Sequence, residues 1–269
     1  MADTAPVRVF HIVGTAYQDL VRVFKTLRRL IVVAALILVG LQLFEYLFLD
    51  GWLGVPVFGW FVALAFVAAK SFLIAPFLIA VHRFILVHEV TERYAFDFHD
   101  RRLLLFFVNS FALAAFGIAI AMLNSLLAMF AVFSPLATML HPGVTIFVAV
   151  VVTSVAAMVV ILRLAILFPA IAVDAGGANA SNAFEDTKGH TLKVVATFVV
   201  ASLPVVAIYL VLALIGISSS HSLNSTRSGS FIGTLVTALV YAGTLPLLIA
   251  LASRLYQVLG DKVLAPASG

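Results

Sequence analysis

The sequence predicts an all-α integral membrane protein, a bundle of six transmembrane helices preceded by an amphipathic helix. Of its 269 residues, 64% are hydrophobic and 10% are charged, whereas a soluble domain carries about 25% charged residues. The apolar residues form long continuous runs. A core of the chain's own cannot cover so much apolar surface, so lipid must shelter the remainder. Alternating patterns typical of a transmembrane β-barrel are not seen.

The first element is an N-terminal helix with a basic polar face, assigned to residues 1–29 as a unit of its own. Its apolar residues recur at steps of three and four, namely Phe10, Val13, Tyr17, Leu20, Phe24 and Leu27. Arg22, Lys25 and Arg29 fall on the other side of the helix, which is the pattern of an amphipathic helix. Two placements are open. The helix lies on the inner membrane surface, or it packs under the bundle as structural support.

Residues 30–269 are predicted to form the transmembrane domain. A helix needs about 20 apolar residues to cross the hydrocarbon layer. The apolar runs place the six crossings at 30–49, 54–75, 104–132, 144–168, 193–217 and 231–256. Taken in consecutive pairs, these spans would form three helical hairpins.

Lysine and arginine residues gather on one side of the predicted spans. They precede the first span, lie in the connections from second to third and from fourth to fifth, and follow the sixth. The connections on the other side carry Arg227 as their single cation. By the positive-inside rule, both termini are cytoplasmic in a multi-pass protein of the bacterial inner membrane. The net charge of +4 then indicates anionic lipids as partners, with other membrane proteins a further possibility, and not nucleic acid.

Two stretches share the order of a cation followed six positions later by a proline. Lys70 and Pro76 lie in "KSFLIAPFLIAVHR", and Arg163 and Pro169 lie in "RLAILFPAIAVDAG". Each stretch ends an even-numbered span whose apolar run is too long for one crossing. Proline removes a helical hydrogen bond and clashes with the preceding turn. We therefore predict that the even-numbered helices are kinked or broken by proline, near Pro76 and Pro169, below a cation near the inner leaflet.

These cations are candidate ligands for lipid or other anions. Lys70 and Arg163 either snorkel to headgroup phosphate or face inward and bind a carboxylate or an anionic headgroup, and for Arg163 the inward placement is favoured. Candidate carboxylate partners are Glu89, Asp174 and Glu185. Lys188 and Arg254 are further candidates for lipid or anion binding.

The segment "RLAILFPAIAVDAGGANASNAFEDTKGH", residues 163–190, resembles a motif of six-span bacterial inner-membrane proteins. That family includes the membrane domain attached to some glycerophosphodiester phosphodiesterases. The matching positions are Arg163, Pro169, Asp174, Ala183, Phe184, Thr187, Lys188 and Gly189. The resemblance implies a short helix after the fourth span. It implies no phosphodiesterase activity, because the sequence contains no such soluble domain.

The short helix is also indicated by its own residues. Asn182 and Glu185 have capping-box spacing, and Gly189 can end the helix in a left-handed turn. The segment is either a linker that positions the fifth span or part of a ligand site.

The sequence lacks a recognisable catalytic constellation. "HEVTE" at 88–92 lacks the second histidine of the HExxH zinc helix, and no GxSxG elbow, P-loop or dinucleotide fingerprint is present. There is no cysteine, which excludes disulfides and thiolate chemistry. We therefore expect no metal, no cofactor and no enzymatic activity.

The function expected from these residues is non-enzymatic. The protein would bind lipid, or would scaffold or assemble membrane proteins, through its basic cytoplasmic face. The alternative is a transporter or permease for a small or lipid-like anionic molecule, with Arg163 as the anion ligand. A membrane enzyme that acts on lipids, using the polar stretch 82–100 at headgroup depth, is the third hypothesis.

Overall fold

A computed structural model of the chain describes residues 8–49, 58–91, 93–133, 142–214 and 231–264. All regular elements in these ranges are helices, which confirms the all-α class. Six helices are long and apolar enough to span a membrane, at Arg28–Phe48, Phe58–Val87, Arg101–Phe130, Ile146–Ala172, Thr191–Leu212 and Phe231–Leu259. The connections predicted for the outer side, with Arg227, lie mostly outside the described residues.

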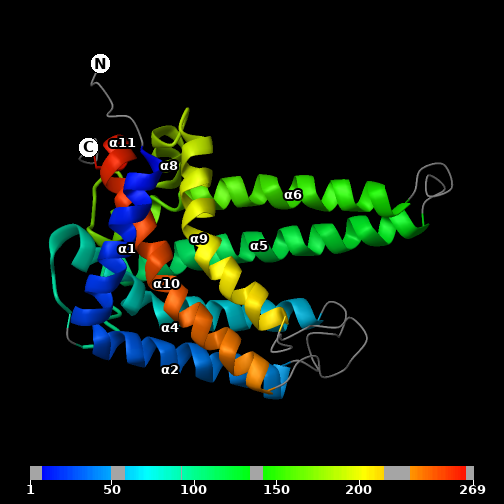
Figure 1. Ribbon diagram of the computed structural model, residues 1–269, viewed down its shortest axis with the longest axis horizontal. Coiled ribbons are helices and arrows are strands. Elements are labelled where there is room, and N and C mark those ends of the chain that lie inside the picture. Colours follow the sequence, from blue (N-terminus) through cyan, green and yellow to red (C-terminus); the bar gives the residue numbers. More distant parts are fainter. Residues whose placement is uncertain (1–7, 50–57, 92, 134–141, 215–230, 265–269) are drawn as a thin grey trace.

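The helices follow one another in the predicted order (Figure 1). The first half of the chain contains α1 (Val9–Thr26), α2 (Arg28–Phe44), the π-helical turn η1 (Glu45–Leu49), α4 (Phe58–Val87) and α5 (Arg101–Phe133). The second half contains α6 (Pro142–Leu164), α7 (Leu167–Ala172), α8 (Ala180–Asp186), α9 (Thr191–Leu214), α10 (Phe231–Leu259) and α11 (Asp261–Leu264). The predicted hairpins α2–α4, α5–α6 and α9–α10 are all packed pairs.

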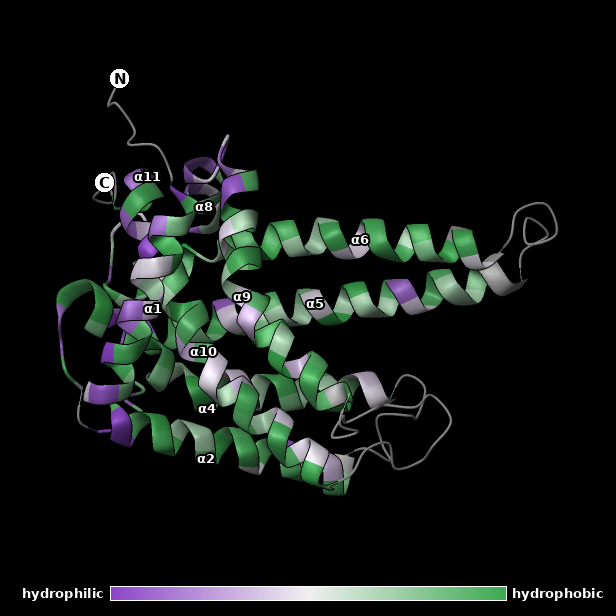
Figure 2. Cartoon of the chain, in the orientation of Figure 1, coloured by the Kyte–Doolittle hydropathy of each residue, from purple (hydrophilic) through white to green (hydrophobic). Residues whose placement is uncertain are grey.

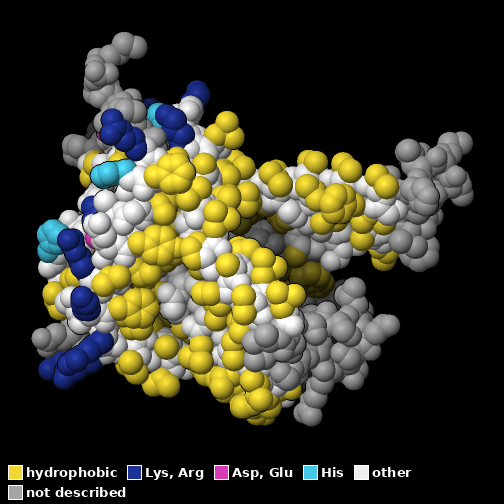
Figure 3. Space-filling model, viewed as in Figure 1, with side chains coloured by type: hydrophobic (Ala, Val, Ile, Leu, Met, Phe, Trp, Pro, Cys, Tyr) yellow, Lys and Arg dark blue, Asp and Glu magenta, His cyan; other side chains and the backbone are white. Residues whose placement is uncertain are grey.

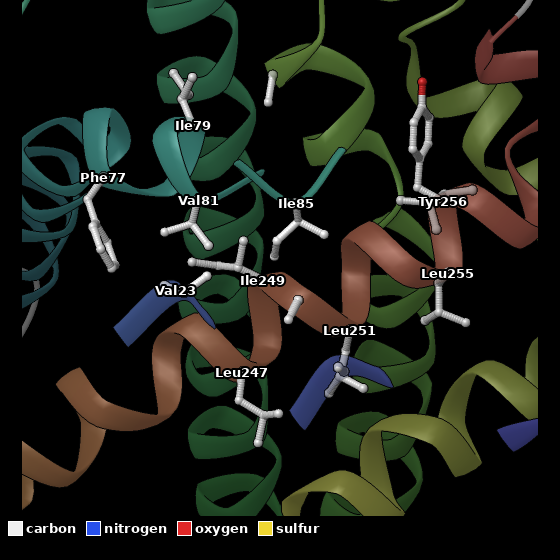
Figure 4. Close-up of a cluster of buried hydrophobic side chains, with 14 of the residues drawn as sticks. Val23, Phe77, Ile79, Val81, Ile85, Leu247, Ile249, Leu251, Leu255 and Tyr256 are labelled. Carbon is white, nitrogen blue, oxygen red and sulfur yellow. The ribbon is translucent and has the colours of Figure 1, made fainter. Parts of the chain in front are cut away.

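Helix α10 is the centre of the packing, since it contacts α1, α2, α4, α7 and α9. Figure 4 shows its side chains among those of α1 and α4; the labelled residues are Val23, Phe77, Ile79, Val81, Ile85, Leu247, Ile249, Leu251, Leu255 and Tyr256. Ala250 on α10 and Ala75 on α4 are fully buried, and small residues of this kind let helices approach closely in lipid. Lipid tails are as apolar as these side chains, so close packing and dispersion hold the helices together within the membrane.

Helices α5 and α6 form an arm that runs away from α9 and α10 (Figure 1). Within the arm, Asn124 of α5 forms hydrogen bonds to α6. The Thr153 hydroxyl donates to Asn124 Oδ1 at 2.5 Å, and Asn124 Nδ2 donates to Ser154 Oγ at 3.2 Å. Hydrogen bonds between membrane helices contribute roughly 1 kcal/mol each, so this cluster helps to keep α5 and α6 paired where other helices do not pack on them.

The predicted proline breaks are right at Pro169 and wrong at Pro76. Helix α6 ends at Leu164 and α7 begins at Leu167. The gap includes Ala165, whose carbonyl lies four positions before Pro169 and is the group that a proline ring displaces. Helix α4, in contrast, runs unbroken through Pro76, and α10 runs through Pro246.

Tyr94 bonds to the backbone of α4 next to Pro76. Its hydroxyl donates to the Leu73 carbonyl at 2.5 Å and interacts with the backbone N–H of Phe77. These are the two groups that would bond to each other in an undisturbed helix. The tyrosine therefore ties the connection that follows α4 to the helical turn that contains Pro76. Burial raises the pKa of the Tyr94 hydroxyl well above its ordinary value, so the hydroxyl keeps its proton.

Helix α1 packs against α9 and α10 across one end of the bundle (Figure 1). The face that packs overlaps the predicted one, since Val13 and Leu27 are buried and Tyr17 and Leu20 are partly buried against the core. It also includes Ile12, Ala16, Asp19 and Val23. Phe10 is 79% exposed and Phe24 is 40% exposed. The helix therefore supports the bundle with one face and leaves a neighbouring apolar row uncovered.

The polar residues concentrate at the end of the molecule that carries α1, α8 and α11. Figure 2 shows hydrophilic residues at this end and hydrophobic ones along the long helices. Lysine and arginine side chains gather there in Figure 3. We call this the charged end. It corresponds to the side for which the sequence predicts the cytoplasm.

Candidate functional site

Arg163, at the end of α6, binds the short helix α8. Its Nε donates to Thr187 Oγ1 at 3.0 Å, and its Nη2 donates to the Phe184 carbonyl. The guanidinium carbon also lies 4.8 Å from the centre of the Phe184 ring, which is a cation–π contact. The guanidinium thus faces protein, and its described partners are a hydroxyl, a carbonyl and a ring instead of a carboxylate.

The N-cap of α8 lies three residues earlier than the predicted cap, Asn182. The N-cap is Asn179, whose side chain accepts from the Asn182 N–H at 2.8 Å. Asn182 instead donates through its side chain to the Gly177 carbonyl at 2.9 Å. Gly189 follows the helix with φ +81°, the left-handed conformation that glycine adopts without strain.

The three carboxylates predicted as partners of Arg163 do not pair with it in the described structure. Glu89 pairs with Arg83, and the hydrogen bond from that guanidinium holds the pKa of Glu89 below its ordinary value. Glu185 pairs with Lys262, and this hydrogen bond lowers the pKa of Glu185. Asp174 is exposed and has a left-handed backbone, with φ 55°. The proposed pairing of Arg163 with one of these acids is therefore wrong.

The two candidate lysines differ in exposure. Lys70 Nζ lies 4.8 Å from the centre of the Tyr241 ring on α10, so a cation–π contact holds this cation against a neighbouring helix. Lys188 is exposed in the turn that follows α8. Of the two, Lys188 is the one open to a headgroup at the charged end.

Arg254 joins α10 to the N-terminal helix. Its Nε donates to Asp19 Oδ2 at 2.5 Å and its Nη2 donates to Asp19 Oδ1 at 2.8 Å. Asp19 is 4% exposed, so the pair is a bidentate, largely buried salt bridge. Sequence reasoning missed Asp19, although it is the only acid in residues 9–26 and falls among the apolar positions 12, 16 and 23.

A polar recess lies where α1 turns into α2. It has a volume of about 280 Å³ and is lined by Thr26, Leu27, Arg28, Arg29, Leu30, Val90 and Thr91. The first turn of α2 forms one wall, and its backbone N–H groups and two arginines favour negative charge. We call it the α1–α2 recess.

A second, apolar cavity lies between the arm and the rest of the bundle. Its volume is about 490 Å³, within the usual range for small-molecule sites. Figure 3 shows the molecule hollowed between these parts. The lining residues are Leu78, His82, Phe106, Ser110, Leu113, Ala114, Gly117, Ile161, Leu162, Ala165, Phe168, Phe198, Tyr241, Leu245, Leu248, Ile249 and Ala252. We call it the arm cavity.

His82 is the buried polar residue of the arm cavity, with 2% of its surface exposed. Its Nδ1 lies 2.8 Å from the hydroxyl oxygen of Ser253, which is fully buried on α10. The ring also lies 6.0 Å from that of Phe106. The sequence predicted His82 at headgroup depth, at the start of the polar stretch 82–100, but α4 carries it into the packed interior.

Comparisons of the chain with protein-family models, curated proteins and solved structures found no match. Within the described residues, no group of three or more histidines and carboxylates is arranged to hold a metal ion. Two hollows therefore stand out among the described residues: a polar recess at the charged end and an apolar cavity between the long helices. The similarity of residues 163–190 to the six-span family stays a prediction.

Proposed function

We propose that this chain is a non-enzymatic lipid-binding protein of the bacterial inner membrane, and that its charged end engages anionic headgroups. The observation that carries the proposal is the division of α1 into three rows. One row packs on the bundle, one is apolar and exposed, and one is basic.

The exposed apolar row contains Phe10, Val21 and Phe24. With 3.6 residues per turn, these positions share one side of the helix, next to the packed face. Arg22 and Lys25 lie on the other side of that row and are exposed. A helix lying in the membrane interface has this division, because its apolar side enters the acyl region while its cations meet headgroups.

The salt bridge between Asp19 and Arg254 holds α1 in place before any lipid arrives. A preorganised helix does not lose conformational freedom on binding, which strengthens the association. The α1–α2 recess follows directly along the chain, and Arg28 and Arg29 line it. A headgroup phosphate placed there would meet two guanidinium groups and the positive end of α2.

The transporter alternative has less support. It requires a cavity that reaches Arg163, and Arg163 is not among the residues that line either the arm cavity or the α1–α2 recess. Its guanidinium is already engaged by Thr187 and Phe184.

The proposal is tested by lipid retention. The protein is reconstituted into nanodiscs that contain equal amounts of phosphatidylglycerol and phosphatidylcholine. The lipid that remains bound after release from the nanodiscs is counted by native mass spectrometry. We compare wild type with Arg22→Gln/Lys25→Gln and with Arg28→Gln/Arg29→Gln. Each cation near an anionic surface contributes about 1 kcal/mol, so each double variant should lose at least tenfold in preference for phosphatidylglycerol.

The matched control is Arg93→Gln/Lys193→Gln, which removes two exposed cations elsewhere at the charged end. It should keep the preference. Equal loss in all three variants would mean that the preference for phosphatidylglycerol depends only on net charge. That result would contradict a site on α1. A wild-type protein without preference for the anionic lipid would end the proposal.

A further inference from the structure

We propose that the arm cavity holds a neutral lipid alcohol, a long-chain amphiphile whose free hydroxyl donates a hydrogen bond to Nε2 of His82. This site is separate from α1 and the recess, so the proposal does not depend on the binding of anionic lipid at the charged end.

The lining of the cavity argues for an uncharged ligand. Among the residues that the structure describes, the lining contains no lysine, arginine, aspartate or glutamate. A phosphate or carboxylate placed there would lose its hydration without gaining an ionic partner, which is strongly unfavourable. A hydrocarbon chain, in contrast, suits the leucine, phenylalanine and alanine side chains that line it.

Ser253 decides which nitrogen of His82 carries the proton. The Ser253 hydroxyl lies 3.0 Å from the Ile249 carbonyl, four positions earlier on α10, and a helical serine commonly donates its one proton to that carbonyl. The serine oxygen then accepts from His82, so Nδ1 carries the hydrogen. In a neutral imidazole the other nitrogen is a bare acceptor. The hydrogen-bond network thus assigns the Nδ1–H tautomer.

Nε2 is the group left for a ligand. Nδ1 is turned toward Ser253, so the opposite edge of the ring, which carries Nε2, is the one available to the cavity. Within the described part of the chain, Ser253 is the hydrogen-bond partner recorded for this side chain. An acceptor left without a donor in an apolar site is unfavourable. A ligand with a hydroxyl removes that penalty, whereas an alkane or an ether does not.

The test compares two probes of nearly equal size, 1-hexadecanol and 1-methoxyhexadecane. Both fit an apolar cavity, but only the alcohol can donate a hydrogen bond. Binding is measured by native mass spectrometry of the full-length protein in detergent micelles. Wild type should bind the alcohol at least tenfold more tightly than the methyl ether.

Four variants make the test specific. His82→Phe keeps an aromatic ring beside Phe106 and should bind both probes equally. Ser110→Ala and Tyr241→Phe remove the other polar groups of the lining and should keep the preference for the alcohol. Gly117→Leu fills the cavity, since a Cβ at Gly117 meets no neighbour within 4 Å, and it should lose both probes.

The tautomer is checked without any ligand. The ¹⁵N chemical shifts of His82 should report a protonated Nδ1 and a bare Nε2 in wild type. The proposal is overturned if the two probes bind equally to wild type, if the preference survives His82→Phe, or if Nε2 carries the proton. If His82→Phe does not fold, the wild-type probe comparison and the ¹⁵N shifts still decide the matter.

Discussion

Aromatic rings contact two of the cations that lie in the membrane-spanning helices. Lys70 meets the ring of Tyr241, and Arg163 meets a hydroxyl, a carbonyl and a ring. Carboxylates pair instead near the ends of these helices, as Glu89 does with Arg83.

Arg163→Leu should lower the free energy of unfolding by about 3 kcal/mol, since it removes hydrogen bonds from a charged donor. Arg163→Lys should restore part of the loss, because an ammonium group cannot reach both acceptors in a fixed fork. The midpoint of thermal unfolding in detergent is the measurement. Arg101→Leu, at an exposed position, is the control. An unchanged midpoint in Arg163→Leu would mean that the contacts with α8 do not contribute to stability.

The pair of Glu89 and Arg83 predicts a pH dependence. The hydrogen bond from Arg83 lowers the pKa of Glu89 from its ordinary value of 4.5. A group whose pKa is lower in the folded state stabilises that state above its unfolded pKa, and the stabilisation disappears as pH falls through the folded pKa. The midpoint of thermal unfolding should therefore drop below pH 4.5, and less so in Glu89→Gln. Identical profiles for both proteins would refute this contribution.

At the scale of elements, similar sequences produce different outcomes. Pro76 and Pro169 each follow a cation by six positions, yet α4 continues and α6 ends. Tyr94, which lies in the connection between α4 and α5, bonds to the Leu73 carbonyl near Pro76, and the local sequence around Pro76 does not reveal this contact. The two stretches are thus not structurally equivalent repeats.

Tyr94→Phe should weaken α4 at this point. It leaves the Leu73 carbonyl without the hydroxyl that now bonds to it, and the loss of one hydrogen bond to a largely buried group amounts to about 1–2 kcal/mol. Amide hydrogen exchange should accelerate at Phe77 and its neighbours. Tyr209→Phe on α9 is the matched control, with no acceleration expected in α4. Unaltered exchange at Phe77 would show that the hydroxyl is dispensable for the continuity of α4.

The docking of α1 on α10 depends on a buried ion pair. Asp19→Ala leaves Arg254 without its carboxylate and should lower the free energy of unfolding by roughly 3–5 kcal/mol. Asp19→Leu/Arg254→Met should recover much of this loss, because it removes both charges together. The chain has no cysteine, so a cysteine at the buried Ala16 reports undocking by its labelling rate. Faster labelling is expected in Asp19→Ala only; equal rates in both variants would contradict the role of the pair.

At the scale of the whole molecule, lysine and arginine side chains gather at the charged end, and hydrophobic residues predominate along the long helices (Figures 2 and 3). The arm exposes large apolar side chains such as Phe130 and Phe147, which is the surface expected of helices in contact with lipid. The orientation of the protein in the membrane is therefore defined by the compartment that the charged end faces.

The positive-inside rule predicts that the charged end is cytoplasmic. A cysteine introduced at Ser181, exposed on α8 at that end, should be labelled by a membrane-impermeant reagent only after the cells are opened. A cysteine at Ser220, in the predicted outer connection, should be labelled in intact cells. The reverse pattern would invert the predicted topology.

Much of the architecture could be read from composition and periodicity. The six spans, their approximate bounds and the collection of cations on one side follow from apolar length and charge position, since the bilayer acts on each helix separately. The ending of α6 before Pro169 is equally local, because a proline acts on the carbonyl four positions earlier.

The partners of the polar groups could not be read in this way. Arg163 meets Thr187 and Phe184, Asp19 meets Arg254, and His82 meets Ser253. The members of each pair lie far apart in the chain, and their meeting depends on how helices pack. The sequence also offers several possible acidic partners for each cation. The fold selects among the possible partners, because it brings a particular polar group within 3 Å of the side chain.

Amino-acid order alone therefore specified a six-span helical membrane protein with one basic side, because hydropathy and charge act residue by residue along the chain. Three-dimensional packing settled the continuity of α4, the partners of the buried polar groups and the existence of the arm cavity. These features arise where helices distant in sequence meet, and hydrogen bonds and shape act only over the few ångströms that such meetings create.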